Sequence, residues 1–421
     1  MHKLKVGVIV DVNLAKSLGG TFSYYNTLLS GINNYEFDQA IEIVNVVFYE
    51  KTQPEVDFKK PVVFIKGYLN ISSKNKLARR VSKGLKSIIK SLTFVNDLLS
   101  LPEKIKFRRI ERDLARNGID IIYHLKPEMV DLNYPFIATH WDLAHKSTYP
   151  FPELALDGHH ESREKYYSNV LNKAMLILCE SNAGIEELRY HYSLSPLRIK
   201  RLPLFGNSDL QLTVSVEAAR QVLNKYGLIT NEFFIYPAQF WALKNHYNLI
   251  VAFAAFIGED PDRHFKLVLP GSDMGNLGYI QKLVADLSLD DSVLFPGFVP
   301  DQELSVFYRH ATAAVMPTFL GPTNMPLIEA ARLKCPVLCS NLKGHYEIMG
   351  EYALYFEPED PGSIQNAMEL LTGNEEGRTS LADSAYTHIM QSEFDLQKSL
   401  SALNTYLLQV KAVRKTWDIT N

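Results

Sequence analysis

The sequence has few cysteines and no long apolar stretch. Cys179, Cys335 and Cys339 are the only cysteines in 421 residues, and no CxxC motif or cluster of cysteine with histidine accompanies them. Each is expected to be a buried, reduced thiol, which favours a cytosolic compartment. The longest uninterrupted apolar run, residues 249–257, is far below the ~18–20 residues that a membrane-spanning helix needs. The first residues lack the apolar length and cleavage site of a signal peptide, so a soluble or surface-bound chain is expected.

The chain also lacks a strong excess of charge. Its net charge is −3, with 46% apolar and 22% charged residues, which is an ordinary globular composition without bulk attraction to nucleic acid. The length is sufficient for about two or three domains of ~100–200 residues. No metal-binding carboxylate pair of the Asp-x-Asp type is apparent, so no metal site is expected.

One segment departs from this average. Between Lys59 and Arg116 there are 16 Lys+Arg and 4 Asp+Glu, a local charge of +12, so the rest of the chain carries −15. Within it, residues 76–92 place apolar side chains at three- or four-residue spacings with Lys and Arg between them, which is typical of a basic amphipathic helix. Such a helix either packs its apolar stripe on its own domain or contacts an anionic membrane surface.

Short apolar runs alternate with helix-period stretches along the whole chain. Such a pattern predicts parallel sheets covered on both faces, arranged as two doubly wound units. The expected helices include residues 218–226, 247–257, 279–287 and 302–310. The expected strands are residues 5–12, 41–50, 61–67, 119–125, 136–143 and 175–181 in the first half, and 233–240, 266–272, 293–299, 313–319, 336–341 and 353–358 in the second. The join is expected near residues 202–215, where Pro, Gly, Asn and Ser cluster.

The stretch FLGPTNMPLIEA, residues 319–330, has many residues that disfavour helices directly before a helical run. Asn324 can cap that helix, and Pro326 suits its first turn. The free amides and the positive end of the helix dipole would form a site for phosphate. Glu329 lies about one turn into the helix, where its carboxylate can accept hydrogen bonds from ribose hydroxyls. The alternative is a capped helix start that binds nothing.

Residues 316–361, with this stretch inside them, closely resemble the donor-site segment of family 4 glycosyltransferases, which are retaining enzymes of the GT-B fold. The family's pattern is a strand ending in Pro-Ser or Pro-Thr, a Glu-x7-Glu motif, Cys/Val-Pro-Val and a closing Leu-Tyr-Phe-x-Pro-x-Asp, and this sequence departs from it at the first glutamate. The likeness continues through residues 292–319 and 233–256, and it is looser in 175–204 and 6–29. It implies an acceptor-binding Rossmann-like domain at 1–205, a donor-binding one at 206–385 that faces it across a cleft, and a helical segment at 386–421 that returns to the first domain.

The resemblance also implies roles in donor binding. The second motif glutamate falls on Glu329, which would hold the nucleotide ribose, while the first falls on Gly321, so its contact with the sugar is missing or supplied elsewhere. Lys244 matches a lysine aimed at the diphosphate, although it could also be an exposed lysine at a helix start, and the partner arginine is replaced by Gln239. The implied donor-binding set is Gly19, Gly20, Gln239, Lys244, Gly271, Phe298, Val299, Asn324, Met325, Pro326, Leu327 and Glu329.

In the acceptor half, the Gly19-Gly20 pair opens a helix after the first strand, either as a simple turn or as a loop under the diphosphate. Residues 137–153 resemble the family's Thr-x-His-Asp-Leu block, whose histidine lines the cleft. His140 is preferred because it ends a strand, with His145 as the second candidate and Asp142 between them. The expected catalytic residues are therefore His140, Lys244 and Glu329.

Together these features lead us to expect a cytoplasmic glycosyltransferase. Attachment to the inner face of the membrane as a peripheral protein is the further expectation from the basic segment. The enzyme would move a hexose-type sugar from a UDP- or GDP-linked donor to a glycan or lipid-linked acceptor hydroxyl, with retention and without a metal, in cell-surface polysaccharide or glycolipid assembly. Two alternatives are a nucleotide-sugar epimerase of the same fold and an inactive subunit that only binds the sugar nucleotide.

Overall fold

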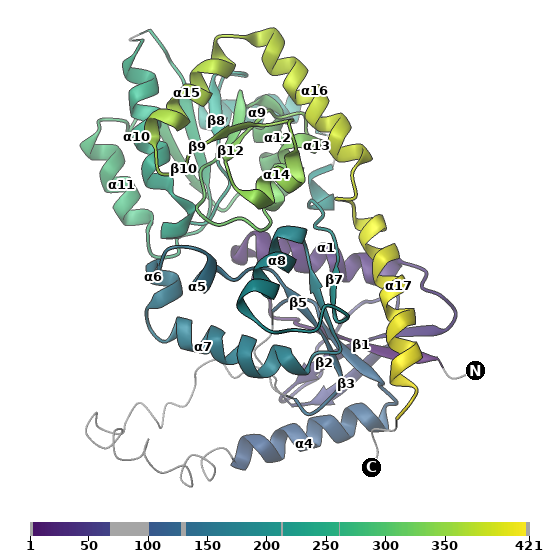
Figure 1. The fold of residues 1–421 in the computed structure, drawn as a ribbon. Coiled ribbons are helices and arrows are strands. Elements are labelled where there is room, and N and C mark those ends of the chain that lie inside the picture. The colour runs from purple at the N-terminus through teal and green to yellow at the C-terminus, as the bar shows by residue number, and fades with distance from the viewer. Residues whose placement is uncertain (1–2, 68–100, 128–131, 212–213, 261, 418–421) are drawn as a thin grey trace, which may run out of the picture.

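The computed structural model describes residues 3–67, 101–127, 132–211, 214–260 and 262–417 (Figure 1). The amphipathic helix expected at residues 76–92 lies outside these residues, so both interpretations of it remain predictions from the sequence. Two α/β domains lie one above the other in Figure 1, and each is built around one parallel sheet.

The N-terminal domain contains a seven-stranded sheet in the order β3-β2-β1-β4-β5-β6-β7. All its strand pairs are parallel. Its strands are β1 (Leu4–Val10), β2 (Ile41–Tyr49), β3 (Val62–Lys66), β4 (Ile121–His124), β5 (Phe136–His140), β6 (Leu176–Cys179) and β7 (Ile199–Arg201). The order reverses direction at β1, as in a doubly wound Rossmann-like sheet.

The C-terminal domain contains a six-stranded parallel sheet in the order β10-β9-β8-β11-β12-β13. Its strands are β8 (Phe233–Ile235), β9 (Lys266–Pro270), β10 (Val293–Gly297), β11 (Ala313–Met316), β12 (Val337–Ser340) and β13 (Leu354–Phe356). The reversal here falls between β8 and β11, which are paired in the middle of the sheet.

Helices cover the sheets and connect their strands. Those of the N-terminal domain are α1 (Gly20–Asn34), α4 (Leu101–Arg116), α5 (Ala144–Ser147), α6 (Pro152–Ala155), α7 (His159–Lys165) and α8 (Asn182–His191). Those that follow are α9 (Val216–Tyr226), α10 (His246–Gly258), α11 (Leu277–Asp286), α12 (Asp301–His310), α13 (Met325–Arg332), α14 (Lys343–Met349), α15 (Pro361–Thr372), α16 (Glu375–Gln391) and α17 (Leu396–Arg414).

The predicted fold class, two Rossmann-like domains, is confirmed. All twelve expected strands and the four expected helices form, with ends shifted by a few residues. The strand β7 was not predicted, because it has three residues, two of which are basic, and it lies at the edge of its sheet, where little apolar surface is buried. The three cysteines are buried and unpaired, as expected.

Both faces of the N-terminal sheet are buried, which explains its nearly continuous apolar strands. On β1, Val8 belongs to the core shared with α1, whereas its neighbour Ile9 packs on the opposite face with Ile110 and Leu114 of α4. Within the described residues, no helix combines the length and apolarity that crossing a bilayer would require.

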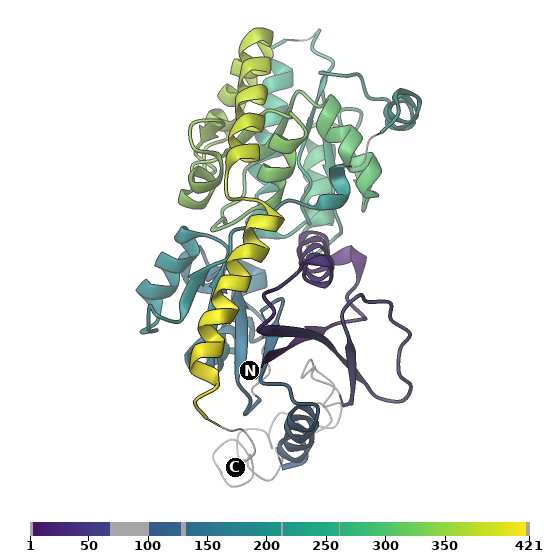
Figure 2. The same cartoon turned by 90° about the vertical axis from the view of Figure 1, so that its right-hand side faces the viewer.

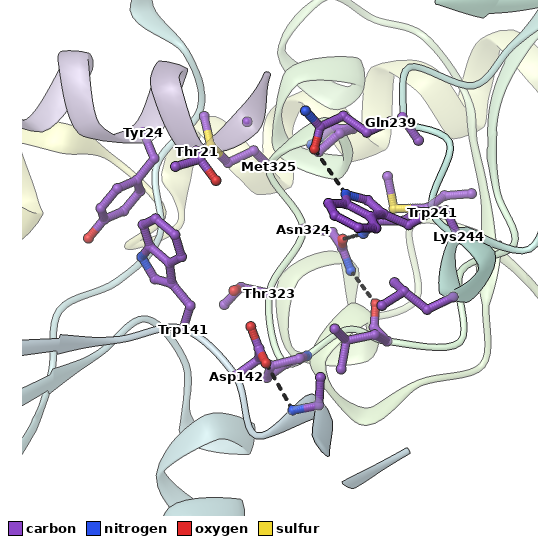
Figure 3. Close-up of a pocket in the computed structure, with 18 of the residues that line it drawn as sticks. Thr21, Tyr24, Trp141, Asp142, Gln239, Trp241, Lys244, Thr323, Asn324 and Met325 are labelled. Carbon is purple, nitrogen blue, oxygen red and sulfur yellow. Dashed lines mark hydrogen bonds between the residues drawn. The ribbon is translucent and has the colours of Figure 1, made fainter. Parts of the chain in front are cut away.

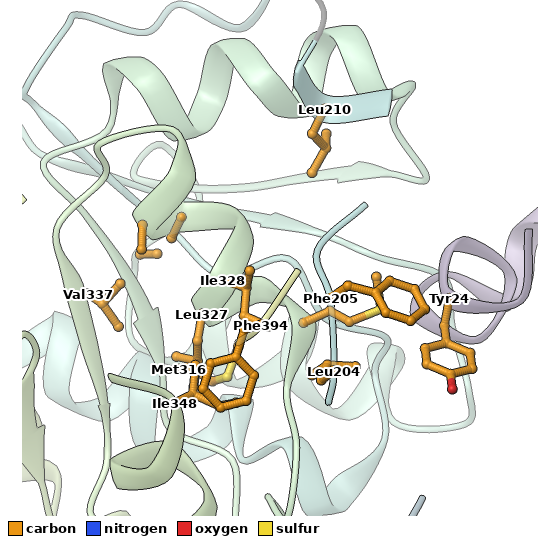
Figure 4. Packing of buried hydrophobic residues seen from close by; sticks show 14 of the residues in the cluster. Tyr24, Leu204, Phe205, Leu210, Met316, Leu327, Ile328, Val337, Ile348 and Phe394 are labelled. Carbon is orange, nitrogen blue, oxygen red and sulfur yellow. The ribbon is translucent and has the colours of Figure 1, made fainter. Parts of the chain in front are cut away.

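The chain passes between the domains twice. The first passage follows β7, where Leu204 and Phe205 pack between Tyr24 of α1 and Ile328 of α13 (Figure 4). The second follows α16, after which α17 runs down the N-terminal domain (Figure 2). There Ser399 Oγ donates to Pro203 O at 2.7 Å, close to the first passage.

A cluster of charges joins the domains beside these passages. Both oxygens of Glu347, on α14, accept hydrogen bonds from the first amides of α8, Asn182 N at 2.8 Å and Ala183 N at 2.9 Å. A carboxylate is favourable there because the helix N-terminus carries positive partial charge. Arg201, at the end of β7, pairs with Glu347 at 3.0 Å and also with Glu393.

Helix α17 is expected to contribute substantially to stability through its buried leucines. Leu403 is fully buried, so Leu403→Ala should lower the free energy of unfolding by about 2–5 kcal/mol. Val413, on the same helix, is 54% exposed, and Val413→Ala should change it by less than about 0.5 kcal/mol. Denaturant unfolding of the two variants measures the difference. Equal midpoints would show that α17 does not pack as described.

Candidate functional site

The site lies between the domains, where the carboxyl ends of strands from both sheets meet. Two cavities of about 480 and 420 Å³ adjoin each other there. Gly20, Gln239, Met325 and Pro326 line both, so the start of α1 and the start of α13 form their common wall. Ligands of doubly wound sheets bind at such strand ends.

The larger cavity has one wall from each domain (Figure 3). Tyr24 and Trp141 come from the N-terminal domain, while Trp241 and Lys244 come from the loop after β8. Thr323, on the loop before α13, lies between them. Its mixture of aromatic faces and a few polar groups is typical of small-molecule sites.

Lys244 lies at the wall of the larger cavity and is only partly exposed. Its Nζ is 3.5 Å from Asn324 Oδ1, a long contact, and no described carboxylate forms an ion pair with it. Burial lowers its pKa to about 8, although the negative charges of Asp142 and Glu153 act in the opposite direction. An ammonium held in this way is available to an anionic ligand.

Asn324 occupies the N-cap position of α13, but its side chain does not cap the helix as the sequence predicts. Its Nδ2 instead donates to Leu320 O at 3.2 Å and lies 2.8 Å from His345 Nε2. The first turn of α13 therefore has no side-chain cap where it meets the cavities, which leaves its backbone amides available to a ligand. Pro326 contributes none of these amides, because proline has no N–H. Leu327 points into the core with 1% exposure and lines neither cavity, so only its backbone could serve a ligand.

Gly321, at the place of the first motif glutamate, has no room for a side chain. A Cβ at this position would lie 2.6 Å from Asn324 Nδ2 and 2.7 Å from His345 Nε2. His345 is buried and anchored through its Nδ1, 2.9 Å from Ser340 O. The contact that a glutamate would make from this loop is therefore either missing or supplied by another residue.

Glu329 lines the smaller cavity from the first turns of α13 and is 7% exposed. Tyr308 Oη donates to its Oε2 at 3.3 Å. Burial raises the pKa of Glu329 to about 7, although the Asn207 amide and the Tyr308 hydroxyl partly offset it. The carboxylate thus ionises near neutral pH and can accept further hydrogen bonds.

The other expected donor-binding residues line the smaller cavity near Glu329 or the wall that the two cavities share. Gln239 Nε2 donates to Ser17 O at 2.9 Å, which links the loop before Gly19 to the loop after β8. Gly19 has φ +56°, a conformation that favours glycine. Gly271 approaches Ala238 O so closely that a Cβ would lie 2.0 Å from it. Phe298, 53% exposed, and Val299 complete the lining of the smaller cavity.

Neither histidine lines the two cavities, whereas the resemblance implies a histidine at the cleft. His140 does end β5 but is 1% exposed, and its Nδ1 is 3.1 Å from Tyr167 Oη. His145 Nδ1 accepts from Arg163 Nε at 3.0 Å, and its Nε2 lies 2.8 Å from Glu164. Burial lowers the pKa of both histidines to about 4, so both are neutral.

Asp142 does reach the larger cavity, but its carboxylate is engaged. Arg163 pairs with it at 2.5 Å, and the Ala144 amide donates to it at 2.9 Å. Burial alone would raise its pKa, yet these two partners lower it overall. Asp142 therefore shapes the cavity wall as a fixed anion.

The sequence analysis did not identify Thr21, Trp141 and Glu180, which also line the larger cavity. Trp141 and Glu180 lie near the ends of the strands expected at 136–143 and 175–181, and in the structure they directly follow β5 and β6. Their position near a strand end was therefore a usable signal. Thr21 follows the Gly19-Gly20 pair and gives no signal of its own. In the part of the chain that the structure describes, no group of three or more His, Cys, Asp or Glu is placed to hold a metal ion.

The architecture is similar to that of solved structures over nearly the whole chain. Sucrose-phosphate synthase from Thermosynechococcus elongatus matches with a TM-score of 0.70 and 17% identity over 97% of this chain and 100% of that one. Anabaena HepE in complex with UDP and glucose matches with a TM-score of 0.64 and 14% identity over 98% and 100%. The chain thus has the GT-B fold.

The sequence of the second domain resembles a known family. Residues 219–388, less than half of the chain, match the model of the family described as glycosyl transferases group 1. The O-antigen chain mannosyltransferase B of Escherichia coli is 28% identical over 201 residues, which is 48% of this chain and 52% of that protein. The matched stretch therefore spans about half the length of this relative.

Glu329 should lower stability at neutral pH. Its folded pKa of about 7 exceeds its ordinary value of 4.5, so between these pH values the unfolded chain loses a proton that the folded chain keeps. Stability therefore falls as pH rises through this window. Glu329→Gln should be more stable than wild type by up to about 3 kcal/mol at pH 7.5, and the difference should shrink toward pH 5. Denaturant unfolding at both pH values measures it, and a difference independent of pH would contradict the assignment.

Proposed function

We propose that the protein transfers a sugar from a nucleoside diphosphate sugar to an acceptor hydroxyl, with retention of configuration. The observation that carries the proposal is the convergence of Lys244, the uncapped start of α13 and buried Glu329 on two adjoining cavities. Cation and helix terminus suit a diphosphate, and a buried carboxylate suits ribose hydroxyls. The group 1 family of residues 219–388 supports the same chemistry.

In this proposal the nucleoside occupies the smaller cavity and the sugar the larger one. Glu329 accepts hydrogen bonds from ribose, while Gly271, Phe298 and Val299 border the nucleoside. Lys244 and the backbone at Gly19, Gly20 and Met325 face the diphosphate. As the bond from sugar to phosphate breaks, negative charge grows on the leaving diphosphate, and these preorganised positive groups stabilise it. No protein nucleophile is assigned.

The choice of substrates is guided by relatives. The E. coli protein is named as an O-antigen chain mannosyltransferase, and the HepE structure contains UDP and glucose. We infer a UDP- or GDP-linked hexose as donor, and a glycan or lipid-linked acceptor in cell-surface polysaccharide assembly. A cytoplasmic location fits such donors. The basic segment 59–116 would then bring the acceptor domain to anionic lipid.

The experiment that tests this function measures nucleoside diphosphate release from a panel of UDP- and GDP-sugars, after a thermal-shift screen for binding. Release with one nucleotide sugar supports the transferase. Binding without release under any condition would favour the inactive subunit, for which the replacement of the first motif glutamate by Gly321 is the best support. Conversion of one nucleotide sugar into another without release would favour the epimerase.

Lys244→Ala should lower kcat by about 10²–10³-fold while changing nucleotide-sugar affinity far less, because the charge it neutralises grows only as the sugar leaves. Steady-state kinetics and calorimetry separate the two effects. Lys282→Ala, an exposed lysine on α11, is the matched control and should behave as wild type. Equal losses in kcat and affinity would make Lys244 a binding residue only.

Turnover should persist in excess EDTA, because the positive groups of the site neutralise the diphosphate in this proposal. Initial rates with and without chelator, using metal-free donor, measure this. A complete loss that added Mg²⁺ or Mn²⁺ restores would overturn this arrangement of charge.

A further inference from the structure

Glu180 is a buried carboxyl group with an oxygen that has no partner. It directly follows β6, lines the larger cavity and is 5% exposed. Thr323 Oγ1 donates to its Oε2 at 2.7 Å across the domain interface. Its Oε1 is buried and forms no hydrogen bond of normal geometry with any described residue, although the Tyr24 hydroxyl, which is also buried without a partner, lies close enough to lower the pKa of Glu180.

The other carboxyl groups of this cavity are already engaged. Asp142 is held by Arg163 and the Ala144 amide, and Glu153 accepts from Leu243 N at 2.8 Å. Of the acids that line the larger cavity, only Glu180 has an oxygen that is both buried and without a partner among the described residues. A buried polar atom of this kind is costly unless a ligand satisfies it.

The surroundings of Glu180 favour its neutral form. Burial raises its pKa to about 8, although the hydroxyls of Thr323 and Tyr24 act to lower it. At neutral pH most of the population is therefore protonated, and the group can both donate and accept a hydrogen bond. A sugar hydroxyl, which also donates and accepts, is a matching partner.

We propose that Glu180 hydrogen-bonds a hydroxyl of the sugar that the donor carries, and so supplies the contact for which Gly321 has no room. The inference rests on the proposed function. Thr323, which holds Glu180, directly precedes Asn324 and the start of α13, where the diphosphate is proposed to bind. The sugar attached to that diphosphate would lie beside Thr323, within the larger cavity that Glu180 lines.

Calorimetry with UDP, UDP-glucose, GDP and GDP-mannose tests the inference, because the two members of each pair share the nucleoside diphosphate and only one of them carries a sugar. Glu180→Met keeps side-chain volume but removes both hydrogen-bonding functions. It should weaken binding of the preferred nucleotide sugar about tenfold and leave the matching free nucleotide unchanged. Glu180→Gln can still donate and accept, and it should retain most of the wild-type affinity.

Glu187→Met is the matched control, since Glu187 also has a buried oxygen without a partner but lines neither of the two cavities. It should bind both members of each pair as wild type does. The inference is overturned if wild type binds nucleotide and nucleotide sugar while Glu180→Met matches it on both, or loses affinity equally for both. If wild type binds none of the four compounds, the proposed function itself fails.

Discussion

The parallel pairing of the strands is the constraint on which the rest of this molecule depends. Every strand pair described in the two sheets is parallel, so all strands of a sheet end on one edge. The two edges face each other, and residues far apart in the chain meet there. Gln239 contacts Ser17, 222 positions away, and Thr323 contacts Glu180, 143 positions away. The site is thus a product of topology more than of any single motif.

The fold was predictable because buried parallel strands are continuous apolar runs. Lys244 and Glu329 were singled out because their segments resemble family 4 glycosyltransferases, since their spacing alone did not favour a binding role. The directions of side chains were not predictable. Asn324 turns away from its helix because His345, 21 positions later, offers it a partner, and His145 turns toward Arg163 and Glu164. Such choices are made by long-range neighbours, which local sequence does not reveal. Glu180 was missed for the same reason, since its importance depends on which neighbours leave its oxygen unpaired.

Burial shifts the pKa values of three ionisable groups of the site toward neutral pH. Burial lowers the pKa of Lys244 to about 8 and raises those of Glu329 and Glu180 to about 7 and about 8. All three therefore lie near neutrality, where small changes in surroundings decide their charge. The fold itself shields these groups from much of the solvent. The site is preorganised, and the folded state carries the cost of that desolvation in reduced stability.

The two passages of the chain between the domains have a mechanical consequence. Both lie beside the cluster of Arg201, Glu347 and Glu393, on the side of the molecule where α17 runs. Because the two connections between the domains are neighbours, the domains can most easily move relative to each other by rotating about the line through these connections. Contacts at that line barely change during such a rotation, whereas those on the side of α6 must separate, among them the hydrogen bond from Leu243 N to Glu153. The two connections therefore define a hinge axis near Arg201, and the separation of the domains during this rotation is largest at α6.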